Sequence, residues 1–310
     1  MSVQQRRDVA PPAGEEIALF TRLQADGYLI LRRAMESKVV AELLDDLNPR
    51  FEATPFCQGD FYGARTKRFG ALLKRSKLTQ HFVMHEKILR IVELALGPYC
   101  DRVQLNLTQA LQIYPGALRQ APHRDQDMYW AAPGAAEYLV NVMWPFGPYT
   151  AENGATLIYP GSNRRQDLGA ADLAAPIAAE LEAGDALLFL GSTLHGAGAN
   201  QTDAPRTGMI VSYSLGWLKP TRTVRLAYPL SEVAARIPAR TGGARWLLRA
   251  HRPNLGTEAN AHRYCSRLLR LEFLAATDIS ASGAGIVRRW FAQNPHQRKC
   301  LSWRERRGDG

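Results

Sequence analysis

The first third of the chain has the apolar spacing of amphipathic helices. Apolar side chains fall three or four positions apart over residues 15–25, from Ser37 to just before Pro49, and over about 86–96, so three helices are predicted. Ser37 is expected to cap the second helix, because a serine oxygen can accept a backbone N–H at that position. A short apolar run at 28–31 predicts one strand between the first two helices.

From residue 103 the pattern changes to the two-residue period of strands. Apolar and polar residues alternate between 103 and 113, which predicts a strand with only one face buried. Glycine- and proline-containing turns then separate four more apolar or alternating runs, at 138–144, 156–159, 186–190 and 209–215. Short strands divided by such turns favour an antiparallel sandwich or barrel, so the chain is expected to be mainly β with flanking helices.

One domain is expected to span residues 15–256, with its β core at about 100–218, after a flexible leader at 1–14. Beyond Pro229 the periodic pattern weakens, and residues 257–310 match no clear template. A lid, a dimer arm and a disordered segment all stay open for that stretch, and a homodimer is possible.

The composition is that of an ordinary globular protein. Of 310 residues, 46% are apolar and 22% are charged, which allows a sizeable core. No run of about 18 apolar residues occurs, so a membrane span is not expected. The N-terminal residues lack the apolar segment of a signal peptide, and the four cysteines have no CxxC spacing. We therefore expect a cytoplasmic protein with reduced thiols.

The net charge of +10 raises the question of nucleic acid as a partner. Residues 261–310 hold ten Lys or Arg and four Asp or Glu, so +6 of the net +10 lies in the last fifty residues. A basic terminal segment is more often solvated than a reader of nucleic acid, and nucleic acid is therefore an unlikely partner.

The candidate chemistry begins at His123-Arg124-Asp125 and continues at His195. Two histidines and one carboxylate form the facial triad that holds non-haem Fe(II) in oxygenases. Side chains two apart on a strand share a face, so His123 and Asp125 can converge if they begin the next strand. His195 follows the buried run at 186–190 in a segment of small residues, where glycines let the backbone approach a ligand closely.

Arg206 stands at the entry to the apolar run 209–215, where a buried guanidinium needs an anionic partner. The 5-carboxylate of 2-oxoglutarate would supply that partner through a bidentate, charge-assisted pair. The alternative is a structural salt bridge or a surface arginine in a loop.

These residues, together with the segment from Asn153 to Arg164 and the Thr66-Lys67-Arg68 stretch, resemble the phytanoyl-CoA dioxygenase family of Fe(II)/2-oxoglutarate oxygenases. The similarity covers about two thirds of the chain, up to Leu215. It implies a double-stranded β-helix, or jelly-roll, core with N-terminal helices packed on it. It also implies that His123, Asp125 and His195 bind Fe(II) and that Arg206 holds the distal carboxylate of the co-substrate 2-oxoglutarate.

The resemblance assigns further roles around the co-substrate. Gln120, Thr156 and Arg68 match positions that line 2-oxoglutarate in relatives. Their alternatives are a turn residue, a plain strand residue and a charge on a helix surface, respectively. Tyr129, Trp130 and Tyr62 are candidate walls of the substrate pocket, as are Phe61, Trp144 and Trp217, although aromatic residues at such positions are more often core.

The function implied is a dioxygenase that uses O2 to oxidise, by default to hydroxylate, an unactivated C–H of a small, largely hydrophobic metabolite in natural-product tailoring. Asp125 argues against halogenation, because related halogenases replace this carboxylate with a small residue. The alternatives are an acyl-CoA hydroxylase of the same family, a nucleic-acid-acting oxygenase, and a jelly-roll binding module without catalysis. Repair dioxygenases usually carry a second arginine six residues after the first, where this chain has Ser212.

Overall fold

The computed structural model describes residues 14–59, 61–129, 136–165 and 175–218 of the chain. The helices of this part are α1 (Gly14–Asp26), α2 (Ser37–Ala53), α3 (Leu72–Arg75), α4 (Thr79–Val83) and α5 (Glu86–Leu96), with 3-10 turns η1 (Gly97–Tyr99) and η2 (Asp125–Met128). The strands are β1 (Tyr28–Leu31), β2 (Thr66–Gly70), β3 (Val103–Ile113), β4 (Leu139–Pro145), β5 (Thr156–Ile158), β6 (Ile177–Ala179), β7 (Ala186–Leu190), β8 (His195–Ala197) and β9 (Arg206–Leu215). Residues 1–13 and 219–310 lie outside the described residues, and with them the basic terminal segment and the expected leader at 1–14 except Gly14, which begins α1.

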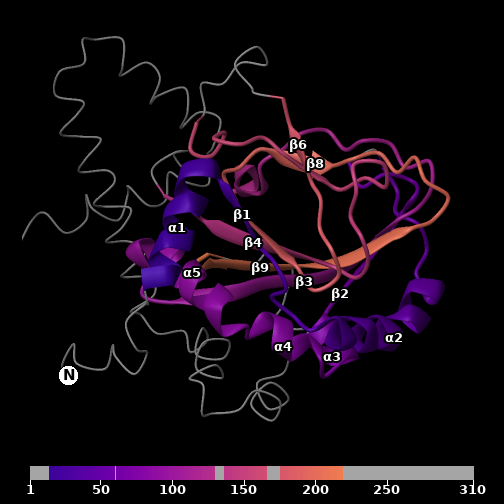
Figure 1. The fold of residues 1–310 in the computed structure, drawn as a ribbon, viewed down its shortest axis with the longest axis horizontal. Coiled ribbons are helices and arrows are strands. Elements are labelled where there is room, and N and C mark those ends of the chain that lie inside the picture. The colour runs from indigo at the N-terminus through magenta and orange to yellow at the C-terminus, as the bar shows by residue number, and fades with distance from the viewer. Residues whose placement is uncertain (1–13, 60, 130–135, 166–174, 219–310) are drawn as a thin grey trace, which may run out of the picture. The chain divides into compact units, whose positions relative to one another are not determined.

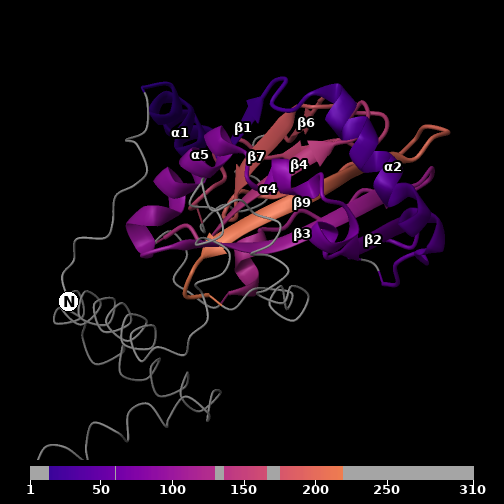
Figure 2. The same ribbon diagram turned by 90° about the horizontal axis from the view of Figure 1, so that it is seen from below.

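The strands form two antiparallel sheets. The larger has the order β1-β7-β4-β9-β3-β2, and the smaller has the order β6-β5-β8. Figure 1 shows the smaller sheet on one side of the larger one and the helices on the other, and Figure 2 shows α2, α4 and α5 lying across the larger sheet. We call the side of the larger sheet that the helices cover its helix face, and the opposite side its inner face. This is the predicted jelly-roll with N-terminal helices packed on it.

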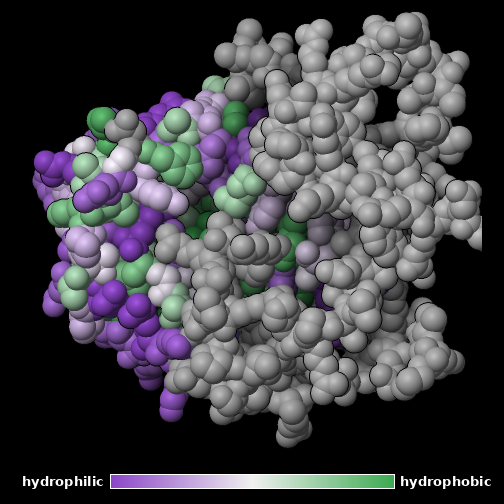
Figure 3. All heavy atoms as spheres, turned by 180° about the vertical axis from the view of Figure 1, so that it is seen from behind, coloured by the Kyte–Doolittle hydropathy of each residue, from purple (hydrophilic) through white to green (hydrophobic). Residues whose placement is uncertain are grey.

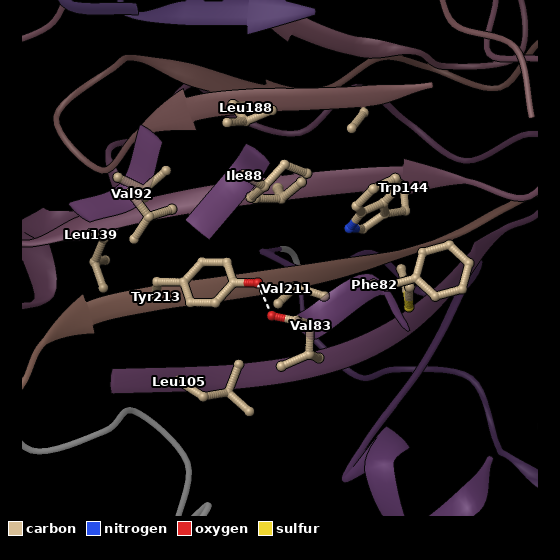
Figure 4. Close-up of a cluster of buried hydrophobic side chains, with 14 of the residues drawn as sticks. Phe82, Val83, Ile88, Val92, Leu105, Leu139, Trp144, Leu188, Val211 and Tyr213 are labelled. Carbon is tan, nitrogen blue, oxygen red and sulfur yellow. Dashed lines mark hydrogen bonds between the residues drawn. The ribbon is translucent and has the colours of Figure 1, made fainter. Parts of the chain in front are cut away.

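Alternation along the strands divides the core between the two faces. In β4, Val140, Val142 and Trp144 join the large apolar cluster under the helices, whereas Met143 joins a smaller cluster between the two sheets. Figure 4 shows part of the large cluster, in which side chains of α4 and α5 meet those of the sheet. Its buried Tyr213 hydroxyl donates a hydrogen bond of 2.7 Å to the Val83 carbonyl, so this polar group is satisfied inside the apolar layer.

The predicted helix over about 86–96 and the predicted strand over 28–31 match α5 and β1, but the second helix differs from its prediction at both ends. Ser37 is not the N-cap: Glu36 holds that position without a side-chain cap, and the Ser37 hydroxyl donates to the Ala183 carbonyl instead. Pro49 does not end the helix, which continues to Ala53. Four residues beyond Leu47, Phe51 is 2% exposed and packs edge-on against Phe69, and this burial offsets the backbone hydrogen bond that proline removes.

The prediction that β3 has only one buried face is wrong, because both of its faces are covered. A register shift between Leu105 and Leu107 makes the odd-numbered side chains of the strand point to opposite sides of the sheet before and after it. Leu105 therefore joins the cluster under the helices, whereas Leu111 and Ile113 join the cluster between the sheets. A simple two-residue period cannot anticipate such a bulge, because one extra residue exchanges the faces of every residue beyond it.

On the described part of the surface in Figure 3, polar and apolar residues are intermingled. Large apolar side chains that stay exposed in the described residues are Ile17, Phe56, Phe61, Tyr62, Leu118, Met128 and Ile177. Among the described helices, none has the length and apolar character that crossing a membrane requires.

Candidate metal and co-substrate site

His123, Asp125 and His195 come together at one point. Each offers a ligand atom, and these atoms all lie within 4.8 Å of one another. Nε2 of His123 lies 3.5 Å from Oδ1 of Asp125, and Nε2 of His195 lies 3.7 Å from Oδ2 of the same carboxylate. Two imidazole nitrogens and one carboxylate oxygen at this spacing fit the 2-His-1-carboxylate facial triad of non-haem iron.

The backbone fixes the relative position of the two histidines. The His123 N–H donates to the His195 carbonyl at 2.9 Å, and the His195 N–H donates to the His123 carbonyl at 3.0 Å. This reciprocal pair is an isolated antiparallel bridge, so the two residues stand directly opposite each other although 72 positions separate them in the sequence.

The expectation that His123 and Asp125 begin a strand is wrong. Asp125 is the first residue of η2, and His123 belongs only to the isolated bridge. Both side chains nevertheless reach the same site, because Arg124 between them has extended backbone angles (φ −113, ψ 129). One extended residue is therefore enough to give the i, i+2 convergence that a whole strand would give.

Hydrogen bonds to the backbone orient both imidazole rings. Nδ1 of His123 lies 3.0 Å from the Ala121 carbonyl, and Nδ1 of His195 lies 3.0 Å from the Thr193 carbonyl. Since a carbonyl can only accept, each Nδ1 carries the proton, and each Nε2 keeps its lone pair for a metal. Both Nε2 atoms are also the ring nitrogens that face Asp125.

The charges of the site follow from burial and from these contacts. Burial alone would raise the pKa of Asp125, but the facing His195 and His123, with Arg68 nearby, lower it below its ordinary value. Burial lowers the pKa of His195 and outweighs the opposing effect of Asp125. Burial alone would also lower the pKa of His123, yet the facing Asp125 carboxylate and the Ala121 carbonyl, which both favour the protonated ring, raise it. An ionised carboxylate beside a neutral His195 suits metal ligation.

Asn141 is a residue of the site that the sequence analysis missed. Its Nδ2 donates a 2.9 Å hydrogen bond to Oδ2 of Asp125 and so orients the carboxylate. Asn141 is 1% exposed and lies in β4 between Val140 and Val142. A polar residue inside an apolar strand was the available signal, because a buried amide needs a partner.

Arg206 opens β9 as a buried guanidinium, 3% exposed. Its Nε and Nη1 atoms are buried and have no hydrogen-bond partner among the described residues. Its Cζ lies 4.2 Å from the centre of the buried Tyr149 ring, whose π face stabilises the cation. A ring stacked on the guanidinium does not accept hydrogen bonds from N–H groups that point outward in the guanidinium plane. Burial lowers the pKa of Arg206, which reflects the cost of this charge without an anion. Within the part of the chain that the structure describes, Arg206 makes no salt bridge, and the carboxylate of 2-oxoglutarate fits the two N–H groups that lack a partner there.

A glycine makes room for the ring beneath Arg206. A Cβ atom at Gly208 would lie 2.1 Å from the Tyr149 hydroxyl oxygen and 2.6 Å from the Trp144 carbonyl, so no larger residue fits there. Tyr149, also missed by the sequence analysis, is tied to Leu181 by two backbone hydrogen bonds. The stacking of Tyr149 on Arg206 is thus fixed from both sides.

Comparison with known proteins agrees with this geometry. The family model of phytanoyl-CoA dioxygenase (PhyH) matches residues 23–208, more than half of the chain. The dioxygenase FrzG of Cladobotryum sp is 31% identical over 249 residues, which cover 71% of this chain and 79% of FrzG. The multifunctional dioxygenase ausE of Aspergillus calidoustus is 30% identical over 262 residues, or 76% of this chain and 84% of ausE. The chain belongs to the phytanoyl-CoA dioxygenase family.

Solved structures share the fold. The non-heme alpha ketoglutarate dependent epimerase SnoN from nogalamycin biosynthesis aligns with a TM-score of 0.57 at 22% identity, over 68% of this chain and 88% of SnoN. HygX from Streptomyces hygroscopicus, solved with nickel and 2-oxoglutarate bound, aligns with a TM-score of 0.52 at 14% identity, over 68% and 91% of the two chains. The protein is an oxidoreductase of the dioxygenase class, and its His-Asp-His site fits Fe(II), with O2 as the co-substrate of dioxygenases.

Arg68 is the second arginine predicted to contact the co-substrate. Arg68 is part of β2, so its alternative as a helix-surface charge is wrong. Its Nη1 donates to Gln109 at 3.3 Å, and its buried Nε has no hydrogen-bond partner. Burial lowers the pKa of Arg68, the charge of Arg206 lowers it further, and the charge of Asp125 opposes this. Arg68 therefore stands near both halves of the site.

The Gln120 side chain bonds backbone groups, and Thr156 lies in a strand. The Gln120 amide donates to the Phe61 carbonyl and accepts from the Ala197 N–H, each at 3.1 Å. It thus ties β8, which begins with His195, to the segment that carries Phe61. Thr156 is the first residue of β5, 4% exposed, and pairs with Ala179 and Ala197. A role in binding the co-substrate stays a prediction for both.

The candidate substrate residues also separate. Phe61 meets the His123 ring edge-on at 4.9 Å and so borders the triad, whereas Tyr62 lies against Phe61 and its ring faces the Arg68 guanidinium. Tyr129 instead stacks on Tyr138 and packs at the edge of the cluster under the helices, and Trp217 packs on Tyr138 as well. Trp144 is buried against Phe82 on the helix face and so is core. Trp130 lies outside the described residues.

Proposed function

We propose that this protein is an Fe(II)/2-oxoglutarate-dependent dioxygenase that oxidises an unactivated C–H of a small, largely hydrophobic metabolite, with hydroxylation as the default outcome. The observation that carries the proposal is the presence of two features on the inner side of the larger sheet. One is a converged His-Asp-His triad, and the other is a buried guanidinium with two N–H groups that have no partner in the described part of the chain. Either feature alone has structural explanations, whereas both together match the needs of a metal and a dicarboxylate co-substrate.

In this proposal His123, Asp125 and His195 hold the iron through Nε2, a carboxylate oxygen and Nε2. The Ala121 and Thr193 carbonyls keep the rings in the ligating tautomer, and Asn141 keeps the carboxylate oriented. When bound, the iron supplies the activation of O2 and the oxidation of the substrate, coupled to the conversion of 2-oxoglutarate to succinate and CO2. The protein supplies binding, orientation and exclusion of water.

Arg206 would bind the distal carboxylate of 2-oxoglutarate through its free Nε and Nη1 groups, with Tyr149 supporting the guanidinium from below. Arg68, whose Nε is also free, would meet the other end of the co-substrate near Asp125. Gln120 and Thr156 are proposed to line the space between them. The guanidinium charge of Arg206 is then compensated only in the loaded enzyme.

An exposed aromatic side chain at the triad supports a hydrophobic substrate. Phe61, which packs edge-on against the His123 ring, is 51% exposed, and its neighbour Tyr62 is 41% exposed. Exposed apolar side chains beside a metal site favour an apolar ligand over a strongly charged one. We therefore favour a natural-product scaffold over an acyl-CoA, whose nucleotide part needs cationic partners.

The test is an anaerobic titration of the full chain with Fe(II) and 2-oxoglutarate, watched through the metal-to-ligand charge-transfer band. We expect the band to appear in the wild type at one iron per chain and to be absent in His195→Ala. Matched panels of apolar scaffolds and acyl-CoA thioesters, followed by succinate release and product mass, then define the substrate. A wild type without the band would contradict the proposal, and turnover confined to acyl-CoA would contradict the substrate class.

A further inference from the structure

A buried carboxylate lies beside the loop that delivers His195. Glu137, just before β4, has a fully buried side chain. Arg164 Nε lies 2.9 Å from its Oε1, and the Ser192 hydroxyl lies 2.7 and 2.9 Å from its two oxygens. Burial raises the pKa of Glu137, whereas Ser192 and Arg164 favour its charged form. A carboxylate taken out of water is costly, so contacts this close point to a role that an apolar residue could not fill.

Arg124 is a second charged side chain that hydrogen-bonds to the loop of Ser192. Arg124 stands between His123 and Asp125, and its Nε donates to the Ser192 carbonyl at 2.9 Å. Its Nη2 donates to the Arg165 carbonyl at 2.8 Å and reaches the Ser162 carbonyl at 3.4 Å. Ser192 is therefore held by Glu137 through its hydroxyl and by Arg124 through its carbonyl. The segments that carry the three metal-binding candidates meet at this one residue.

We propose that Glu137 is a positioning residue for the metal centre, which acts through Ser192 on His195 and, through Arg124, on the segment of His123 and Asp125. The inference rests on the proposed iron site and adds to it a residue that touches neither metal nor co-substrate. Ser192 precedes His195 by three residues, and the intervening Thr193 carbonyl orients the imidazole. A shift of Ser192 is thus passed directly to the hydrogen bond that fixes the His195 ring, and metal sites tolerate only small displacements of their ligands.

Asp185 offers a matched control for an ordinary structural role. It is 2% exposed, precedes β7, and pairs with Arg32 at 2.7 Å. It also accepts backbone N–H bonds from Arg33 and Glu182, each at 2.9 Å. Like Glu137 it is a buried, ion-paired carboxylate next to a strand of the larger sheet. None of its described partners belongs to the segments that carry the triad, so Asp185→Asn should affect stability alone.

The experiment compares full-length wild type, Glu137→Gln, Ser192→Ala and Asp185→Asn. Thermal unfolding without metal reports stability, and anaerobic Fe(II) titration in excess 2-oxoglutarate reports metal affinity and the position of the charge-transfer band. We expect Glu137→Gln and Ser192→Ala each to weaken Fe(II) binding about tenfold, the usual scale for residues that orient metal ligands, and to shift the band. Asp185→Asn should lower the unfolding temperature while leaving affinity and band unchanged.

Because the Glu137–Ser192 contact is shared, the double variant should lose less affinity than the product of the single losses. Unchanged affinity and band in both single variants would overturn the inference, as would an equal loss of affinity in Asp185→Asn. If Glu137→Gln does not fold, Ser192→Ala alone decides, since it removes the same contact from the loop side. A wild type that gives no band refutes the proposed iron site itself, whereas a normal wild type with normal variants refutes only the role of Glu137.

Discussion

Alternate residues of the same strands serve the two faces of the larger sheet, and these faces differ in the side chains that they bury. On the helix face, Val142, Leu188 and Val211 are fully buried in an apolar layer without charged groups. The Tyr213 hydroxyl of this layer has its carbonyl partner, whereas the Trp144 Nε1 has none among the described residues. On the inner face, Asn141 serves a carboxylate and Arg206 keeps two N–H groups without a partner. Stability is thus expected to depend on one face and ligand binding, as proposed, on the other.

The difference between the faces teaches where substitutions should act. A substitution on the helix face should change the free energy of unfolding and leave metal and co-substrate affinity in the folded protein alone. A substitution on the inner face should do the reverse, because its polar groups are arranged for a ligand and carry a cost in its absence.

The largest expected effect is on the inner face, at the triad. Asp125→Ala removes a charged ligand, and losing several kcal/mol of metal-dependent stabilisation corresponds to a fall in substrate-dependent succinate formation of about 10³-fold or more. His123→Ala should behave alike. The unfolding temperature of metal-free His123→Ala should change little, because this side chain belongs to no apolar cluster. Metal-free Asp125→Ala should be moderately less stable, because the buried Asn141 amide loses its acceptor.

Asp127→Ala is the matched control for this prediction. Asp127 is an exposed acid in the same 3-10 turn as Asp125, and it should keep full turnover. Full turnover of Asp125→Ala at saturating iron would remove the triad assignment, and with it the claim that the inner face binds the ligand.

The next effect belongs to the helix face. Leu188→Ala in β7 empties a fully buried position and should lower the free energy of unfolding by about 3 kcal/mol, measured by urea denaturation. Fe(II) affinity of the remaining folded protein should match that of the wild type. Ile177→Ala, at a 38% exposed position of β6, should stay within about 0.5 kcal/mol. A fall of iron affinity in Leu188→Ala would show that the two faces are coupled.

Arg206→Met sharpens the comparison, because this one substitution should weaken 2-oxoglutarate binding without lowering the free energy of unfolding. Losing one partner of a buried charge pair costs about 2–5 kcal/mol, so the KM for 2-oxoglutarate should rise about a hundredfold. The metal-free protein should be no less stable than the wild type, because the substitution removes a buried cation that has two unpaired N–H groups. An unchanged KM would place the carboxylate-binding residue elsewhere, and a large loss of stability would mean that Arg206 is structural.

Much of this division could be predicted from the sequence. The helical stripe of α5, the strand β1 and the runs that became β4, β7 and β9 are long or strongly apolar, and pattern alone locates them. The triad was found because three residue types with a specific chemistry stand at interpretable spacings. Arg206 was singled out for a physical reason, since a cation at the start of an apolar strand needs an anionic partner, and its role in binding the co-substrate stays a prediction.

What the sequence did not predict depends on contacts between distant residues. The bulge in β3 reverses the faces of that strand without any residue that marks it, and Phe51 carries α2 past Pro49 only because Phe69 covers it. Arg68 was open to interpretation as a helix-surface charge, because the strand β2 is defined by its pairing with β3. Asn141 and Tyr149 acquire their roles only when Asp125 and Arg206 are brought to them.

The smallest expected effect tests whether the helix face is as closed as its contacts indicate. Tyr213→Phe keeps the ring in place and removes only the hydroxyl that donates to the Val83 carbonyl in α4. The carbonyl is left buried without this partner, so the free energy of unfolding should fall by about 1 kcal/mol.

Burial raises the pKa of Tyr213 far above its ordinary value, so the hydroxyl stays protonated. The effect of Tyr213→Phe should therefore not vary between pH 6 and pH 9, both of which lie below the pKa of about 10 of an ordinary tyrosine. Parallel urea denaturation of Tyr213→Phe and wild type at both pH values measures this. A loss near zero would mean that water reaches the Val83 carbonyl between α4 and β9. The helix face would then be open to solvent at this point, since the Val83 carbonyl would have found a second partner, and its contrast with the inner face would rest on apolar packing alone.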